Sequence, residues 1–419
     1  MCKIRRKFTV VNGSSPKSDV EEYWDGEICW ITPEDLSLEN GIFIHESRRT
    51  ITQAGYESCG TKLVPKGSIV LSTRAPIGHV KLAGRELCTN QGCKTLVKKG
   101  SDIDENYIYY YLSCTSDVLN SMGQGSTFLE LSNENLSNYE FPIPPLELQE
   151  QISDFLKDRT KEVYHLISKQ YDIIELLKEK RQAIITNAVT KGRDPNVPMK
   201  DSGIEWIGEI PEHWEFNKIK RVAYVKGRIG WKGLTSSEYL EKGYAYLVTG
   251  EDFIEKKINW DSCYQVDELR YRDDPYIQLR EGDLLVTKDG TIGKLAIVQN
   301  LNKPACLNSG IFLVRPVNSY ISDFLYWILC SRVFSDYNGM KAMGSTVQHL
   351  YQNVFEEFAF PMPSIAEQKQ LVNYLNIKTD EIDSLIVKLQ KLIDNLKELK
   401  SSLISSAVTG KIDVRGISL

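Results

Sequence analysis

The segment that decides the fold is Phe141-Pro142-Ile143-Pro144-Pro145, which leads into Gln149-Glu150-Gln151 and a long amphipathic run ending at Ala188-Val189-Thr190. Nearly the same sequence returns at an offset of 219 residues, as Phe360-Pro361-Met362-Pro363, Gln368-Lys369-Gln370 and Ala407-Val408-Thr409. An offset this long is not the period of a solenoid repeat. The chain is therefore predicted to be a tandem duplication of a globular domain plus a helix.

The repeat continues upstream with small changes of register. Gly67-Ser68-Ile69-Val70-Leu71-Ser72 matches Gly282-Asp283-Leu284-Leu285-Val286-Thr287, Gly125-Ser126-Thr127 matches Gly344-Ser345-Thr346, and Thr32-Pro33-Glu34-Asp35 matches Thr249-Gly250-Glu251-Asp252. Such a chain can present two related surfaces to a ligand that has an approximate twofold symmetry of its own.

Composition places the chain among ordinary globular proteins. Its 419 residues, 42% hydrophobic and 26% charged, suggest two to three domains at roughly 150 residues each. No apolar stretch approaches the ~18 residues of a membrane-spanning helix, and the basic N-terminus is followed by too short an apolar run for a signal peptide. Nine scattered cysteines without a CxxC motif favour reduced thiols, so we expect a cytoplasmic protein.

The globular halves are predicted to mix short strands with one buried helix each. Residues 69–72 and 80–82 form a hairpin-like unit, which residues 284–287 and 295–298 repeat. Residues 107–112 and 324–329 are rich in aromatic side chains and are predicted to be buried helices. Core packing is preferred over base stacking for them, because the aromatic residues run together inside a helix.

Two long helices are predicted over residues 145–191 and 364–410. In the second, apolar side chains recur in alternating steps of three and four, the a/d pattern of a coiled coil. These positions are Ile382, Leu385, Leu389, Leu392, Leu396, Leu399 and Leu403. The same register in the first helix gives Val163, Leu166, Gln170, Ile173, Leu177, Lys180 and Ile184. Because so narrow a stripe suits a single partner, we expect the helices to pack on each other rather than each on its own domain.

These elements divide the chain into six parts. The globular domains take residues 1–144 and 218–363, the helices follow each domain, and a tail takes residues 411–419. Residues 192–217 form a linker and an irregular segment, which Trp206 and Trp214 are expected to anchor by burying their rings.

No catalytic arrangement stands out. Gly290-Thr291-Ile292-Gly293-Lys294 has the wrong spacing for a phosphate-binding loop, Asp273-Asp274-Pro275-Tyr276 lacks the second proline of an adenine methyltransferase motif, and Glu255-Lys256-Lys257 fits the minimal nuclease pattern as many solvated clusters do. The five histidines lie at no metal-ligand spacing. We therefore predict no catalytic residue and no metal site, and a recognition protein is favoured.

One segment resembles a known family. Asp201-Ser202-Gly203-Ile204-Glu205-Trp206-Ile207-Gly208-Glu209-Ile210-Pro211-Glu212-His213-Trp214 is similar to the central segment of the specificity (S) subunits of type I restriction–modification systems. The run from Pro144 to Ile152 and the two Ala-Val-Thr endings resemble the limits of that family's spacer helices. The resemblance covers essentially the whole chain.

The resemblance implies an α+β fold of two tandem mixed α/β target-recognition domains, each followed by a long α-helix, with the helices packed as an antiparallel coiled coil. Each domain would recognise one half of a split target in double-stranded DNA. The implied partners are two methyltransferase (M) subunits and the restriction (R) subunits, and no membrane. Cofactors are expected only on the partners, as S-adenosylmethionine, ATP and Mg. The alternatives are a DNA-modifying enzyme, either an adenine methyltransferase or a nuclease, and a protein-only scaffold.

The first half departs from the pattern of that family. Lys218-Ile219-Lys220-Arg221 follows a full lead-in, whereas the matching Ile4-Arg5-Arg6 lies almost at the start of the sequence. One docking surface for a methyltransferase subunit is therefore in question. Either the natural start lies further upstream, or the tail at residues 410–419 supplies part of that surface.

The candidate DNA contacts come from the repeated turns. Bidentate base contacts favour Arg, Lys, Gln and Asn, and Ser and Thr are adaptable. The candidates are Arg74, His79, Lys81, Gln124, Ser126 and Thr127 in the first domain, and Lys288, Lys294, Lys341, Ser345, Thr346 and Gln348 in the second. Because matched positions serve domains that bind different sequences, some of these side chains are expected to contact phosphates. The two Gly-Ser-Thr turns fit a plain polar turn equally well.

Overall fold

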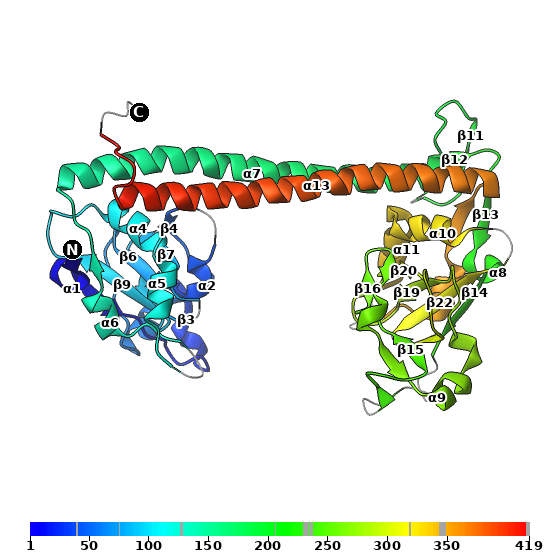
Figure 1. Ribbon diagram of the computed structural model, residues 1–419, viewed down its shortest axis with the longest axis horizontal. Coiled ribbons are helices and arrows are strands. Elements are labelled where there is room, and N and C mark those ends of the chain that lie inside the picture. The colour runs from blue at the N-terminus through cyan, green and yellow to red at the C-terminus, as the bar shows by residue number, and fades with distance from the viewer. Residues whose placement is uncertain are drawn as a thin grey trace. The chain divides into compact units, whose positions relative to one another are not determined.

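The computed structural model describes residues 1–38, 41–74, 76–125, 129–205, 207–228, 234, 238–317, 320–342 and 349–415, with the side chains of residues 341 and 342 excepted. The chain forms two compact units, shown with their elements in Figure 1. Unit 1 comprises Met1–Asp172 and Leu389–Leu419, and unit 2 comprises Ile173–Lys388. Each unit therefore contains one globular domain and a part of both long helices.

Unit 1 is built on two mixed sheets. The larger has the order β2 (Phe8–Asn12), β9 (Cys93–Lys98), β6 (Ile69–Ser72), β7 (Val80–Ala83) and β4 (Phe43–Ile44). The smaller has the order β5 (Thr50–Ile51), β3 (Trp24–Ile31) and β8 (Cys88–Thr89), and β1 (Cys2–Lys3) pairs with β10 (Glu140–Phe141). The antiparallel pairing of β6 with β7 confirms the predicted hairpin.

The helices of unit 1 are short apart from the two long ones. They are α1 (Ile4–Lys7), α2 (Pro33–Leu36), α3 (Gln53–Glu57), α4 (Glu105–Ser113), α5 (Ser116–Ser121) and α6 (Asn133–Asn138), with a 3-10 turn at Glu21–Tyr23. The predicted aromatic helix is α4, which Asp104 caps, and its six residues from Tyr107 to Leu112 are buried. Ile69 and Leu71 pack in the same core as α4, whereas Val70 between them packs in a second core on the other face of the sheet.

Unit 2 repeats this plan. Its larger sheet is β14 (Ala223–Gly227), β22 (Ile311–Pro316), β19 (Leu284–Thr287) and β20 (Leu295–Ile297), and its smaller sheet is β18 (Tyr264–Val266), β15 (Ala245–Val248) and β21 (Ala305–Leu307). Three further pairs are β13 (Glu215–Lys218) with β23 (Ala359–Met362), β16 (Phe253–Ile254) with β17 (Lys257–Ile258), and β11 (Met199–Asp201) with β12 (Glu209–Pro211). The strand orders match those of unit 1 except at β4, which has no counterpart in the larger sheet among the described residues of unit 2. The structure therefore confirms two tandem domains of one mixed α/β fold.

The helices of unit 2 also correspond to those of unit 1. They are α8 (Ile219–Val222), α9 (Glu268–Asp273), α10 (Ser322–Cys330), α11 (Arg332–Ala342) and α12 (Gln352–Glu357), with 3-10 turns at Trp260–Ser262 and Pro275–Ile277. The second predicted aromatic helix is α10, which is buried from Phe324 to Leu329. The predicted second hairpin is β19 with β20.

The long helices are α7 (Leu146–Lys191) and α13 (Ile365–Val408). Gly192 and Gly410 follow their ends with φ of 73°, a conformation that glycine adopts without strain. In unit 1, Lys400 Nζ lies 3.2 Å from the Tyr164 hydroxyl. In unit 2, Arg181 Nε lies 3.0 Å from Asp383 Oδ1. The residue number rises along α7 from Tyr164 to Arg181, whereas that of the partner in α13 falls from Lys400 to Asp383. The two helices are therefore antiparallel.

Half of the predicted helix seam is wrong by one residue. Val163 and Ile382 are buried, and Leu177, Ile184, Leu389, Leu396 and Leu403 are partly buried. Leu166, Ile173, Leu385, Leu392 and Leu399 are instead 41% to 57% exposed. Their neighbours Ile167, Ile174 and Ile393 take the buried places. Two helical registers are possible, one that buries Leu166 and Leu392 and one that buries Ile167 and Ile393, and they have every seventh residue in common. Both registers consist largely of apolar side chains, so the spacing alone could not distinguish them.

The segments that follow the long helices differ between the units. In unit 2 the Trp214 ring is fully buried, and its Nε1 donates to Glu367 Oε1 at 3.0 Å, near the start of α13. This confirms the predicted anchor, whereas Trp206 lies outside the described residues. In unit 1 the tail contributes Ile412 and Val414 to the main core.

Candidate nucleic-acid interface

In each domain the structure brings the two repeated turns together. The Leu131 amide donates to the Thr73 carbonyl at 2.8 Å, directly after β6. In the second domain the Leu350 amide donates to the Lys288 carbonyl at 3.0 Å, directly after β19. Residues far apart in the sequence therefore meet at the same end of the larger sheet in both domains. Ser126, Thr127, Ser345, Thr346 and Gln348 lie outside the described residues, and so does the side chain of Lys341.

One basic and one acidic side chain join the two turns in each domain. Arg74 Nε lies 3.0 Å from Glu130 Oε2 in the first domain. At the equivalent positions of the second domain, Asp289 pairs with His349. The positions match because Arg74 and Asp289 each lie two residues after their strand. The basic and acidic partners have thus exchanged places, and both pairs are partly exposed, where such pairs contribute about 0–1 kcal/mol of stability.

One of the predicted contacts in the first domain, Lys81, is wrong, and a second, His79, is half-buried. The side chain of Lys81 is buried in β7, and its Nζ donates to the Gly41 carbonyl. The equivalent position in β20 is the buried Ala296, so this position faces the protein interior in both domains. His79 is half-buried, and burial, followed by the charge of Lys81, lowers its pKa below the usual value of 6.5.

The other described candidates remain accessible to different degrees. Gln124 is exposed, and its backbone forms a two-way bridge with Glu130, 3.0 Å in each direction. Lys288 is half-buried, with its Nζ 3.2 Å from Asp289 Oδ2 and 5.7 Å from the centre of the Phe312 ring. Lys294 is exposed on the turn between β19 and β20. Of the described candidate lysines in the second domain, Lys294 is therefore the one best placed for a phosphate.

A cavity of about 470 Å³, here called the turn cavity, lies beside that turn in the second domain. Its wall includes Asp289, Thr291 and Lys294 from the turn. The carboxyl ends of the parallel neighbours β15 and β21 add Thr249, Gly250, Glu251 and Asn308, and Tyr239 and Tyr264 complete one side. Sequence patterns did not single out Glu251, Asn308 or the two tyrosines. For Glu251, the repeat match of Thr32–Asp35 with Thr249–Asp252 was a signal that the sequence did offer.

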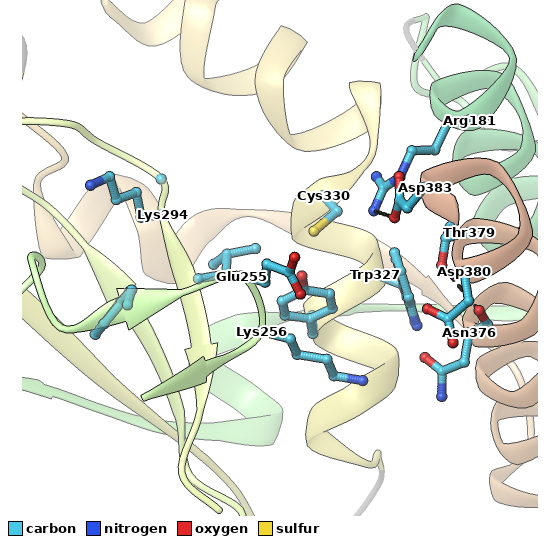
Figure 2. Close-up of a pocket in the computed structure, with 14 residues that line it drawn as sticks. Arg181, Glu255, Lys256, Lys294, Trp327, Cys330, Asn376, Thr379, Asp380 and Asp383 are labelled. Carbon is cyan, nitrogen blue, oxygen red and sulfur yellow. Dashed lines mark hydrogen bonds and ion pairs between the residues drawn. The ribbon is translucent and has the colours of Figure 1, made fainter. Parts of the chain in front are cut away.

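A second cavity of about 570 Å³ in unit 2 lies between α10 and the long helices. Figure 2 shows Trp327 of α10 between Glu255 and Lys256 on one side and Thr379 and Asp380 of α13 on the other. In unit 1 the corresponding place between α4 and the long helices is lined by Tyr109, Tyr110, Thr160, Tyr164 and Lys400. The repeat offset aligns Lys400 with Arg181, but it aligns Tyr164 with Asp383, so the two cavities differ in charge.

The motifs considered for catalysis have structural partners. Lys256 pairs with Asp323, and its Nζ lies 5.0 Å from the centre of the Tyr326 ring. Asp274 is buried, and its carboxylate accepts from the Tyr276 amide at 3.3 Å. Within the described ranges, no group of three His, Cys, Asp or Glu side chains could hold a metal ion. No helix in this part of the chain is long and apolar enough to cross a membrane.

Comparison with known proteins gives matches along both halves. The family model of the type I restriction modification DNA specificity domain matches residues 3–176 and 211–394. The MjaIX specificity subunit of Methanocaldococcus jannaschii is 28% identical over 431 residues, which cover 98% of this chain and 93% of the relative. The MjaVIII specificity subunit of the same organism is 27% identical, with coverages of 97% and 91%.

Two solved structures are similar in fold. One chain of a type I R-M system, from work on its complex assembly and conformational transition, has a TM-score of 0.73 at 15% identity and covers 98% of this chain and 97% of its own length. The HsdS subunit from Thermoanaerobacter tengcongensis has a TM-score of 0.50 at 15% identity, with coverages of 98% and 96%. These matches agree with the resemblance carried by residues 201–214.

Proposed function

Because this chain belongs to the family of type I restriction–modification DNA specificity proteins, we propose that it is the non-catalytic subunit that selects the DNA sequence for such a system. Each domain recognises one half of a bipartite target in double-stranded DNA. Catalysis belongs to the methyltransferase and restriction subunits with which the chain assembles, and the cytoplasm is its place of action. S-adenosylmethionine, ATP and Mg are bound by those partners.

The observation that carries this proposal is the pair of side chains, one basic and one acidic, that joins the two turns in each domain. The backbone bonds from Leu131 to Thr73 and from Leu350 to Lys288 are equivalent, so both domains hold their turns in one way. The side chains at the same place differ, with Arg74 and Glu130 in one domain and Asp289 and His349 in the other. The same backbone arrangement with different side chains is suited to two domains that bind DNA in the same orientation and recognise different bases.

The number of partner subunits follows from the duplication. Each unit combines a globular domain with the beginning of one long helix and the end of the other. A partner that binds this combination finds it twice, which supports two methyltransferase subunits for each specificity subunit. The restriction subunits then join through the complex.

The decisive experiment is to map methylated adenines in the host genome with and without this gene. We expect methylation at one bipartite sequence to disappear when the gene is deleted and to return when it is restored. Unchanged methylation after deletion would contradict the proposal. A purified chain that binds S-adenosylmethionine on its own would contradict the assignment of catalysis to the partners.

A further inference from the structure

The turn cavity of the second domain is lined by an acidic side chain, Glu251. Its equivalent in the first domain, Glu34, is paired with an arginine. Glu34 and Glu251 are equivalent, since each lies between a threonine and an aspartate that make the same bond. The Thr32 amide donates to Asp35 Oδ2 at 2.8 Å, and the Thr249 amide donates to Asp252 Oδ2 at 2.7 Å. The backbone thus places both glutamates in the same way.

The two glutamates differ in their partners. Glu34 Oε2 lies 2.9 Å from Arg48 Nη1. Glu251 is exposed, lines the turn cavity and has no ion-pair partner in the part of the chain that the structure describes. The carboxylate of Glu251 is therefore available to a ligand, whereas that of Glu34 is held by an arginine of its own domain.

The chemistry of a free carboxylate decides what it can recognise on DNA. An ionised carboxylate only accepts hydrogen bonds. It repels phosphates, so it is unsuited to the backbone contacts that supply most of the affinity. In the major groove the donors are the exocyclic amino groups, N4 of cytosine and N6 of adenine. Glu251 is therefore suited to contact a base and not the DNA backbone.

The surroundings of Glu251 support the same use. Tyr239 and Tyr264 form one wall of the cavity, with ring centres 5.3 Å apart. Aromatic walls lower the local dielectric constant, which strengthens a hydrogen bond to an ionised acceptor. Lys294 lines the same cavity and offers a cation to a phosphate next to the recognised base. An acceptor for a base and a cation for the backbone thus share one concave site.

We propose that Glu251 recognises an exocyclic amino group, of cytosine or adenine, in the half-site of the second domain. This inference rests on the proposed function, because it assumes that the second domain contacts DNA. In the first domain the equivalent Glu34 is paired with Arg48, so a contact to a base there would first have to replace that ion pair. Glu251 is thus a specificity-determining residue of one domain only.

The test uses the complete complex in cells, with methylated adenines mapped across the genome. Glu251→Ala should relax one base pair of the second half-site and lower discrimination there roughly tenfold. The first half-site should not change. Glu34→Ala is the matched control and should leave the whole target unaltered.

Each other outcome overturns the inference. An unchanged target in Glu251→Ala does so, and so does a relaxed position in the first half-site. If Glu251→Ala methylates nothing, Glu251→Gln decides, because it keeps the shape of the side chain but removes the charge and replaces one acceptor oxygen with a donor NH2 group. A changed position in Glu251→Gln supports the inference, whereas an unchanged target or total loss overturns it.

The same experiment separates this inference from the proposed function. If deletion of the gene leaves methylation intact, the proposed function itself fails. If deletion abolishes methylation but Glu251→Ala keeps the original target, the role of Glu251 alone is overturned.

Discussion

Gln149 and Gln368 make the same two hydrogen bonds in the two units. Each is fully buried, and its Nε2 donates to the carbonyl five residues earlier, Pro144 at 2.8 Å and Pro363 at 2.9 Å. Each Oε1 accepts from the backbone amide just before the aromatic helix, Asp104 or Ile321, at 3.0 Å. One glutamine thus joins the beginning of a long helix to its own domain in each unit.

The first prediction follows from these bonds. Gln149→Ala should destabilise unit 1, and Gln368→Ala unit 2, by roughly 2–6 kcal/mol each, because at least two buried backbone groups lose their partner at about 1–3 kcal/mol apiece. Hydrogen exchange should show faster exchange confined to the affected unit. Gln151→Ala and Gln370→Ala are matched controls, since both side chains are exposed, and should change nothing. Uniform loss of protection in both units would contradict the prediction.

The second prediction is that specificity is modular. Exchanging residues 1–140 for those of a relative should change one half-site of the methylated sequence and preserve the other, because each unit has its own cores. Methylation mapping measures the outcome. Simultaneous change of both half-sites would show that the domains do not recognise DNA independently.

The third prediction concerns the long helices, which both cross the boundary between the units. Inserting seven residues into each helix at that boundary keeps the a/d pattern and adds about 10 Å. At ~3.4 Å per base pair, the gap between the half-sites should grow by about three base pairs. A four-residue insertion in α7 alone is the control and should impair assembly, because it shifts one side of the seam. An active seven-residue variant with the original gap would rule out a spacing role.

The fourth prediction concerns phosphate binding. Lys294→Ala, and less strongly Lys288→Ala, should weaken DNA binding by the complex on all sequences, because each removes a cation at the turn of the second domain. The slope of the logarithm of affinity against the logarithm of salt concentration should fall by about 0.9 for each phosphate that the variant no longer neutralises. The control is Lys242→Ala, which removes an exposed lysine outside the turn. A changed target sequence in Lys294→Ala would instead assign this side chain to a base.

The fifth prediction is a pH dependence of stability at Glu357. Hydrogen bonds from Lys218 and Lys220 lower the pKa of Glu357 to about 2. A lowered folded-state pKa stabilises the fold above the unfolded value of about 4.3, and this stabilisation is lost as pH falls toward 2. The melting temperature of Glu357→Gln should therefore lie below that of the parent at neutral pH, and the difference should vanish near pH 2. Glu212→Gln, which changes an exposed side chain of the same unit, is the control and should leave the melting temperature unaltered.

The sequence by itself determined the duplication, the hairpins, the aromatic helices and the family. These features depend on local periodicity and on a constant offset between two copies, so they are visible without any contact between distant residues. The anchoring role of Trp214 was also predictable, because a large aromatic ring in an irregular segment is stable only when it is buried.

Only the tertiary structure decided which candidates face outward and which partners they meet. Lys81 looked like a surface cation, yet it lies in β7, a strand that is buried on both faces, and its Nζ donates to the Gly41 carbonyl. The helix seam required the same information, because Ile393 is buried beside the exposed Leu392 although both are apolar. Glu34 and Glu251 occupy identical local sequence positions, but only the folded chain places Arg48 against the first and an open cavity beside the second. Charge and burial at these sites depend on segments that are distant in sequence, and this is why no local pattern encodes them.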